Sequence, residues 1–101
     1  MRLTAEARLD TTEGSRYLKQ LCRHWGHRFD VDFDDERGTI RFGGSACDLI
    51  AEPTTLIVRV HAADAEQVIA LGGVVADHLA RFAFREQLSF TWSAPFAAGS
   101  H

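Results

Sequence analysis

The sequence has little cysteine, little proline and almost no lysine. It contains two cysteines and two prolines in 101 residues, and its only lysine, Lys19, stands among 11 basic residues that are otherwise arginine. Two cysteines are too few for the disulfide framework of a small secreted domain, and they fit a reducing compartment. We therefore expect Cys22 and Cys47 to be free, buried thiols, and the protein to act in the cytoplasm.

Long apolar runs and an excess of positive charge are also missing. No apolar run approaches the roughly 20 residues that cross a bilayer, and the first ten residues lack the apolar core of a secretory signal. Acidic residues outnumber basic ones by 14 to 11, for a net charge of −3. Nucleic-acid binders usually carry a basic surface. The sequence therefore predicts neither a membrane protein nor a nucleic-acid-binding protein.

The remaining composition is that of one ordinary globular domain. Hydrophobic residues make up 46% of the chain and charged residues 25%, which is enough to bury a core at this length. We expect a single domain over residues 1–93, followed by a C-terminal tail over residues 94–101.

Hydrophobic periodicity predicts the secondary structure. Alternation predicts strands, and helical spacing after a capping residue predicts helices. Residues 3–9 and 29–33 alternate, and so do the returning strands that follow short turns at 39–42, 46–52 and 55–61. Helices are expected over 13–26, ending at Gly26, and from Asp64 to about Phe82, with a kink or a close backbone approach at Gly72-Gly73. A last short strand is expected over 88–92.

This order predicts an α+β two-layer sandwich, because consecutive strands with short turns pair antiparallel and two helices then cover one face. We expect an antiparallel sheet of four to six strands. The β-α-β-β-β-β-α order is similar to that of the TATA-binding-protein-like fold and of the C-terminal domain of phosphohexomutases, although a fold does not determine a function.

Two polar clusters lie at the helix ends. His24 and His27 are three residues apart at the end of the first helix, where they either stabilise the helix end or share a ligand, unless Gly26 ends the helix too early. His78, Arg81 and Arg85 form a polar stripe on the second helix. The two arginines either pair with acidic neighbours such as Asp77 or Glu86, or bind a carboxylate or phosphate.

If the two helices pack side by side, His24, His27 and His78 are candidate ligands for zinc or iron.

Other motifs are excluded. The acids Asp30, Asp32 and Asp34 resemble the start of a calcium loop, but the required glycine is replaced by Asp35, so they are the wet side of a strand. No nucleophile or phosphate-loop motif is present, and we expect the protein not to be an enzyme.

Two segments carry a family resemblance. Residues 15–27 follow the pattern RYLxQLCxHxxH, and residues 78–88 follow HLxRFAFRExL. Together with an acidic hairpin over residues 33–42, they resemble the bacterial domain-of-unknown-function 2218 family over roughly residues 5–92. Gly72-Gly73 and Trp25 depart from the family pattern, and neither departure affects the polar residues.

The resemblance implies a context rather than an activity, because such domains also occur fused to or encoded near siderophore-interacting flavoproteins and iron-uptake systems. It makes an iron-siderophore or another small anionic ligand the candidate ligand and such a flavoprotein a candidate partner. The implied ligand-binding residues are Arg16, Tyr17, His24, His27, His78, Arg81 and Arg85.

Two main hypotheses follow, and a metal-dependent enzyme, which needs three ligands around one ion, stays open as a third. The first is a binding or accessory module linked to iron or siderophore metabolism. The second is a structural or oligomerisation domain, such as a homodimer, in which the same residues form internal salt bridges. Apolar side chains at Phe84, Phe90, Trp92 and Phe96 are candidates for a dimer face or for the core.

Overall fold

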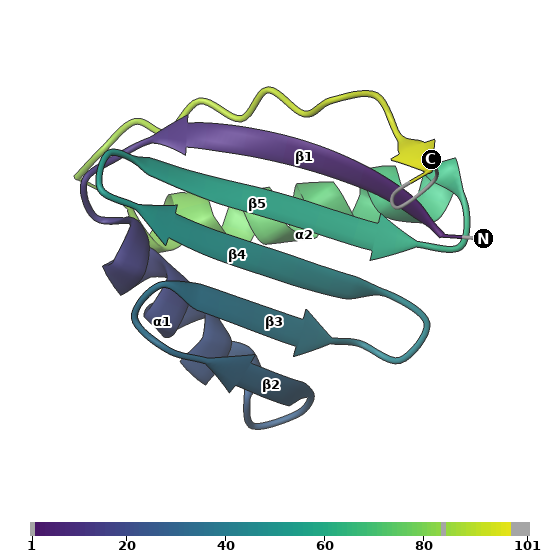
Figure 1. Ribbon diagram of the computed structural model, residues 1–101, viewed down its shortest axis with the longest axis horizontal. Coiled ribbons are helices and arrows are strands. Elements are labelled where there is room, and N and C mark those ends of the chain that lie inside the picture. The colour runs from purple at the N-terminus through teal and green to yellow at the C-terminus, as the bar shows by residue number, and fades with distance from the viewer. Residues whose placement is uncertain (1, 84, 98–101) are drawn as a thin grey trace.

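The computed structural model describes residues 2–83 and 85–97. It has two layers, a six-stranded antiparallel sheet and two helices that both lie on one face of it (Figure 1). This confirms the predicted α+β sandwich. Along the chain the elements are β1 (Leu3–Asp10), α1 (Gly14–Trp25), β2 (Asp30–Phe33), β3 (Arg37–Arg41), β4 (Ala46–Glu52), β5 (Thr55–Ala62), α2 (Ala65–Phe82) and β6 (Phe96–Ala97).

The sheet order is β2-β3-β4-β5-β1-β6, so β1 lies beside β5 instead of its neighbour in sequence. Leu3 pairs with Ala62 and Asp10 with Thr55, which places β1 against the full length of β5. Helix α1 packs on β2, β3 and β4, and α2 packs on β5 and β1. In the part of the chain that the structure describes, no helix covers the opposite face of the sheet.

Alternation along the strands separates the two faces. On β1, Ala5, Ala7 and Leu9 are buried beneath the helices, whereas Glu6 and Arg8 lie on the other face with Thr4. The strand predictions at 3–9, 46–52 and 55–61 are confirmed within one residue. Phe33 differs from the expectation of a buried residue, because β2 is the edge strand and leaves its side chain 40% exposed.

The helices begin and end close to the predicted residues. Asp64 caps α2, and its Oδ1 accepts a hydrogen bond from the Gln67 N–H at 2.8 Å. Helix α1 has no acidic first turn, because Glu13 is its N-cap, and the Glu13 N–H donates to Thr11 Oγ1 at 3.0 Å. Gly26 follows the last residue of α1, as the sequence predicts.

The C-terminal segment corrects two expectations. Residues 88–92 form no strand, and the predicted tail contains β6, which pairs with β1 at Leu3 and Thr4. The segment runs along the outer edge of β1 (Figure 1). Leu88, Phe90 and Trp92 still pack against the core. Just after them, Ser93 bonds to β1, its N–H donating to Glu6 O at 2.8 Å and its Oγ accepting from the Glu6 N–H at 2.9 Å.

The segment also contacts the helix layer, since the indole ring of Trp92 packs on Gly72 of α2. Proline at position 95 lacks the N–H that a ladder needs, and regular pairing starts only after it. The predicted tail residues 98–101 lie outside the described residues, as does Phe84.

Candidate functional site

The two helices bring His24 and His78 together. Their ring centroids are 5.1 Å apart, although the residues are far apart in the sequence. The His78 ring also lies 4.7 Å from the ring of Trp25, and the His24 ring 6.0 Å from that of Phe82. His24 is exposed and His78 half-buried. The side-by-side packing of α1 and α2 therefore places two imidazoles next to each other at the surface.

His78 has a defined hydrogen-bonding role. Its Nδ1 lies 2.8 Å from the carbonyl oxygen of Val74, one turn earlier on α2. A carbonyl oxygen only accepts, so Nδ1 carries the proton. The other nitrogen, Nε2, is left as an acceptor in the neutral ring.

The third histidine does not join this pair. His27 lies in the turn after α1 and is exposed, because Gly26 ends the helix before it. Within residues 2–83 and 85–97, no three His, Cys, Asp or Glu side chains are grouped so that they could hold a metal ion. The expected convergence of His24, His27 and His78 on one ion is therefore wrong.

A pocket of about 280 Å³ is connected to the histidine pair through Phe82. It lies between the helices, and Phe82 belongs to both the pocket and the contact with His24. We call the pocket and the two histidines together the helix groove. Its lining residues are Arg16, Tyr17, Phe82 and Arg85, of which three are sequence-predicted site residues.

Tyr17 and Arg16 have internal partners within the helix groove. The Tyr17 hydroxyl donates to Glu86 Oε2, and Thr11 Oγ1 donates to both Glu86 oxygens at 3.0 Å. Burial, together with this carboxylate, raises the pKa of Tyr17 above its usual value. Arg16 pairs with Glu13 at 2.9 Å on the exposed surface. Tyr17 thus offers the pocket its ring, while its hydroxyl ties α1 to the C-terminal segment.

Arg81 lies apart from the groove lining. It pairs with Asp77, one turn earlier on α2, with Nη2 3.2 Å from Oδ2 and both side chains largely exposed. The structure therefore shows the alternative in which Arg81 pairs with its acidic neighbour Asp77. An exposed pair of this kind contributes about 0.5 kcal/mol or less to stability.

A second polar arrangement lies on the helix-free face of the sheet. His61 Nε2 is 2.7 Å from Asp48 Oδ2, and His61 Nδ1 is 2.7 Å from Thr4 Oγ1. Thr39 Oγ1 donates to the other Asp48 oxygen at 2.8 Å. This chain of hydrogen bonds crosses β1, β5, β4 and β3. The His61 bond is the main cause of the lowered pKa of Asp48, so this carboxylate is ionised at neutral pH.

This Thr4–His61–Asp48 chain has the composition of a nucleophile, a base and an orienting carboxylate. Thr4 is only 1% exposed, however, and it does not line the adjacent pocket. No substrate can reach its hydroxyl, so the arrangement is a stabilising network. A hydroxyl either donates or accepts, so Thr4 satisfies Nδ1 in both charge states of the imidazole.

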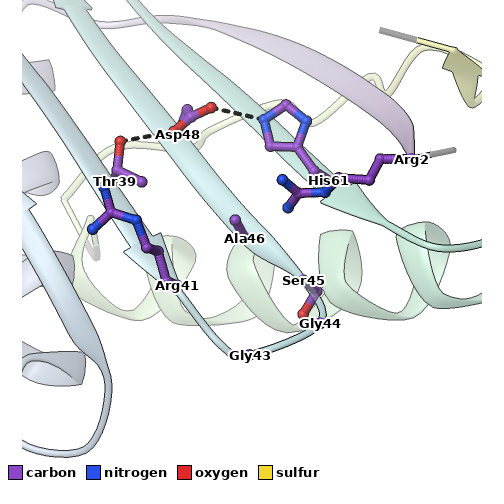
Figure 2. A pocket seen from close by; sticks show the side chains of 9 residues that line it. All are labelled: Arg2, Thr39, Arg41, Gly43, Gly44, Ser45, Ala46, Asp48 and His61. Atoms are coloured by element: carbon purple, nitrogen blue, oxygen red, sulfur yellow. Dashed lines mark hydrogen bonds and ion pairs between the residues drawn. The ribbon is translucent and has the colours of Figure 1, made fainter.

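The network borders a pocket of about 520 Å³, which we call the sheet pocket (Figure 2). Its lining comes from the residue before β1, from the β3–β4 hairpin and from β5. The lining residues are Arg2, Thr39, Arg41, Gly43, Gly44, Ser45, Ala46, Asp48 and His61. None of them is among the sequence-predicted site residues.

Comparison with known proteins places the chain. A family model described as "Uncharacterized protein conserved in bacteria (DUF2218)" matches residues 6–93. The chain belongs to this family. The two helix motifs predicted membership of this family, and the match confirms the prediction. No curated protein matches the chain.

A solved structure supports the DUF2218 fold. The NMR structure of PA4090 from Pseudomonas aeruginosa is 37% identical in sequence, with a TM-score of 0.78. The match covers 90% of this chain and 95% of that one. The family description and this neighbour name no activity, so the function has to be argued from the sites themselves.

The residues that sequence reasoning missed lie on the polar faces of strands. Thr4, Asp48 and His61 each alternate with buried residues, and such positions are usually solvated. Only the register, with Thr4 opposite His61 and Thr39 opposite Asp48, brings them together. The available signal was a histidine and an aspartate on the wet sides of neighbouring strands, but this signal does not specify the register.

Proposed function

We propose that this DUF2218 domain is a non-enzymatic binding module that holds an anionic ligand in the helix groove. The observation that carries the proposal is the contact of His24 with His78, at 5.1 Å between centroids, beside the pocket that Phe82 shares. The guanidiniums of Arg16 and Arg85 supply N–H donors and positive charge on the same side of the molecule as the two imidazoles.

The rings of the groove favour a flat anion. Tyr17 and Phe82 line the pocket, and Trp25 lies against His78. Arginine side chains stack on planar π systems and also bind carboxylate or phenolate oxygens. The combination suits an aromatic carboxylate or a catecholate better than a compact inorganic ion.

The finer proposal is that this ligand belongs to iron or siderophore metabolism in the cytoplasm, with a siderophore-interacting flavoprotein as the partner. Its support is the context that the family resemblance implies. The chemistry of the groove is compatible, because ferric catecholate complexes are anionic and carry aromatic rings. Iron is then part of the ligand, and the protein supplies no metal site of its own.

Isothermal titration calorimetry tests the proposal with ferric catecholate and ferric hydroxamate siderophores, each beside its iron-free chelator. We expect saturable binding of the catecholate that falls at least tenfold in the variants His24→Ala and Arg85→Gln. The matched controls His27→Ala and Arg28→Gln change the same residue types outside the groove lining and should bind normally. Absence of binding in the wild type, or equal losses in all four variants, contradicts the proposal.

A second candidate function is dimer formation through α2. Ile69 and Val74 on its outer side are 66% and 47% exposed. A second copy packed antiparallel, with its centre between Gly73 and Val74, places Glu66 opposite the partner's Arg81. This pairing of opposite charges at both ends favours a copy of the same chain as the occupant.

Sedimentation equilibrium tests this alternative. We expect Arg81→Glu to weaken self-association and the double variant Glu66→Arg/Arg81→Glu to restore it, because the charge pair is then reversed. A wild type that stays monomeric at the highest soluble concentration removes this candidate. Of the other apolar residues considered for a dimer face, Phe90 and Trp92 pack against the core, whereas Phe96 is 45% exposed.

A further inference from the structure

The sheet pocket contains an arginine that no described residue neutralises. Arg2 is exposed and forms no ion pair or hydrogen bond with residues 3–83 or 85–97. Its guanidinium extends over the sheet beside His61 (Figure 2). A side chain in that position presents N–H donors and a positive charge to the hollow.

The carboxylate of the pocket is already in use. Among the described residues that line it, Asp48 is the one carboxylate, and its two oxygens accept from His61 at 2.7 Å and from Thr39 at 2.8 Å. Since the His61 ring is also bonded to Thr4, these side chains are fixed in place. The side chains that remain available for hydrogen bonds in the pocket are mainly donors. A ligand that binds there therefore has to supply acceptors.

Arg41 provides a second guanidinium on the far side of the pocket. Its contacts with Asp30 and Asp32, at 3.3 and 3.0 Å, both involve Nη1, which leaves the other nitrogens for a ligand. The two aspartates are 72% and 78% exposed, so water and salt screen their charges strongly. They reduce the positive potential at Arg41 without occupying the pocket.

The β3–β4 turn keeps the rim of the pocket open. Gly43 has a φ of 99°, in the left-handed region that side chains rarely adopt. A Cβ on either Gly43 or Gly44 would have no atom within 4 Å. The turn therefore presents backbone and the Ser45 hydroxyl to the hollow without a side chain that fills it.

We propose that the sheet pocket binds the anionic end of a small organic molecule, a phosphate or a carboxylate, between Arg2 and Arg41. The Ser45 hydroxyl is a third donor, and Asp48 and His61 form the fixed floor. The volume of about 520 Å³ exceeds that of an oxyanion, so the rest of the ligand lies along Thr39 and Ala46. This site is separate from the helix groove, because it lies on the other face of the sheet and shares none of its residues.

NMR spectroscopy of the untagged, ¹⁵N-labelled protein tests the site with inorganic phosphate, with citrate, and with sodium chloride at the same ionic strength. We expect saturable shifts of the Gly43, Gly44 and Ser45 amides with phosphate or citrate. The stronger of the two identifies the headgroup as phosphate or carboxylate. Chloride shifts that match both probes show a general salt effect and overturn the proposal.

Matched variants locate the binding. Arg2→Gln should weaken the stronger probe at least fivefold, because Arg2 has no other described partner and precedes the first strand. Arg8→Gln is the control, since Arg8 is exposed on the same face but lies outside the pocket. Equal effects of the two variants overturn the proposal. Arg41→Gln should also weaken binding, and retention of full affinity there contradicts its assigned role.

One further variant separates this site from the proposed function. His24→Ala removes a side chain of the helix groove and should leave phosphate or citrate binding at the sheet pocket unchanged. Loss of binding there in His24→Ala overturns the claim that the two sites are independent. If calorimetry detects no ligand binding at the helix groove, saturable NMR shifts at Gly43–Ser45 still support binding at the sheet pocket.

Discussion

Trp92 lies directly on Gly72 of α2. A Cβ placed on that glycine would stand 3.4 Å from Cε2 of the indole ring. The neighbouring Gly73 faces away, and a Cβ there would meet nothing within 4 Å. Of the kink and the close approach that the glycine pair predicted, the structure shows a close approach at Gly72.

This difference predicts opposite effects of substitution at the two glycines. Gly73→Ala should raise the free energy of unfolding by about 1 kcal/mol, because alanine favours an exposed helix interior. Gly72→Leu should lower it by about 1–3 kcal/mol, because the side chain displaces Trp92 from its contact. Urea denaturation followed by circular dichroism measures both. A stabilising Gly72→Leu would show that Trp92 does not pack there.

Gly38 on β3 has a different neighbour, the thiol of Cys22. A Cβ there would lie 2.8 Å from Cys22 Sγ and 3.3 Å from Leu18 Cδ2. Gly38→Ala should therefore lower the free energy of unfolding by about 1–3 kcal/mol. The double variant Gly38→Ala/Cys22→Ala should be more stable than the sum of the single effects predicts, since the sulfur is removed. Strict additivity in a denaturant series would contradict the close contact.

The Asp48 carboxylate should contribute stability that depends on pH. Its pKa in the folded protein is lowered, first by the hydrogen bond with His61. This contribution is complete above the unfolded pKa near 4 and is lost as the pH falls through the lower folded value. Asp48→Asn should therefore destabilise the protein by about 1 kcal/mol at pH 7.

Thermal unfolding from pH 2 to pH 7 measures this dependence. The difference between the wild type and Asp48→Asn should shrink as the pH falls below about 4. Asp35→Asn is the control, because Asp35 is 82% exposed and pairs only with Lys19 among the described residues. A difference that stays constant across the whole range would contradict the ionic role of Asp48.

The two cysteines should be unreactive in the folded protein. Both are free and buried, and burial raises the pKa of the Cys22 thiol to about 11 and that of Cys47 further. A thiol with that pKa is ionised in about one molecule in a thousand at pH 8, and only the thiolate reacts readily. A disulfide reagent should modify both thiols in 6 M guanidinium chloride and neither one rapidly under native conditions. Fast native modification would contradict their burial.

The fold was predictable from the sequence because most of its elements have unambiguous periodicity. On α1, residues at helical spacing such as Leu18, Leu21 and Trp25 form the buried stripe, and Asp64 caps α2 as predicted. The likeness to the TATA-binding-protein-like and phosphohexomutase folds stays a prediction. The strand prediction at 88–92 failed because Leu88, Phe90 and Trp92 alternate as side chains packed against the core, while this stretch pairs with no strand. Alternation reports which side chains are buried and does not show which backbone groups pair.

The candidate sites were predictable only where the packing of the two helices brings the residues together. The positions of His24 and His78 on two neighbouring helices were enough to suggest their contact. His27 does not join them, because it lies in the turn that Gly26 begins. The sheet pocket was not foreseen, because it depends on the register of four strands and on the position of Arg2. These long-range relationships leave no mark on local spacing.

The C-terminal segment has a consequence for how the protein behaves at high concentration. Without residues 85–97, β1 would present a row of open backbone groups on which another chain could add a strand. The opposite edge is protected differently, since β2 has only four residues and carries the exposed acids Asp30 and Asp32. A chain cut after Ala83 would therefore have one exposed strand edge. It would tend to form ordered aggregates by strand addition at β1.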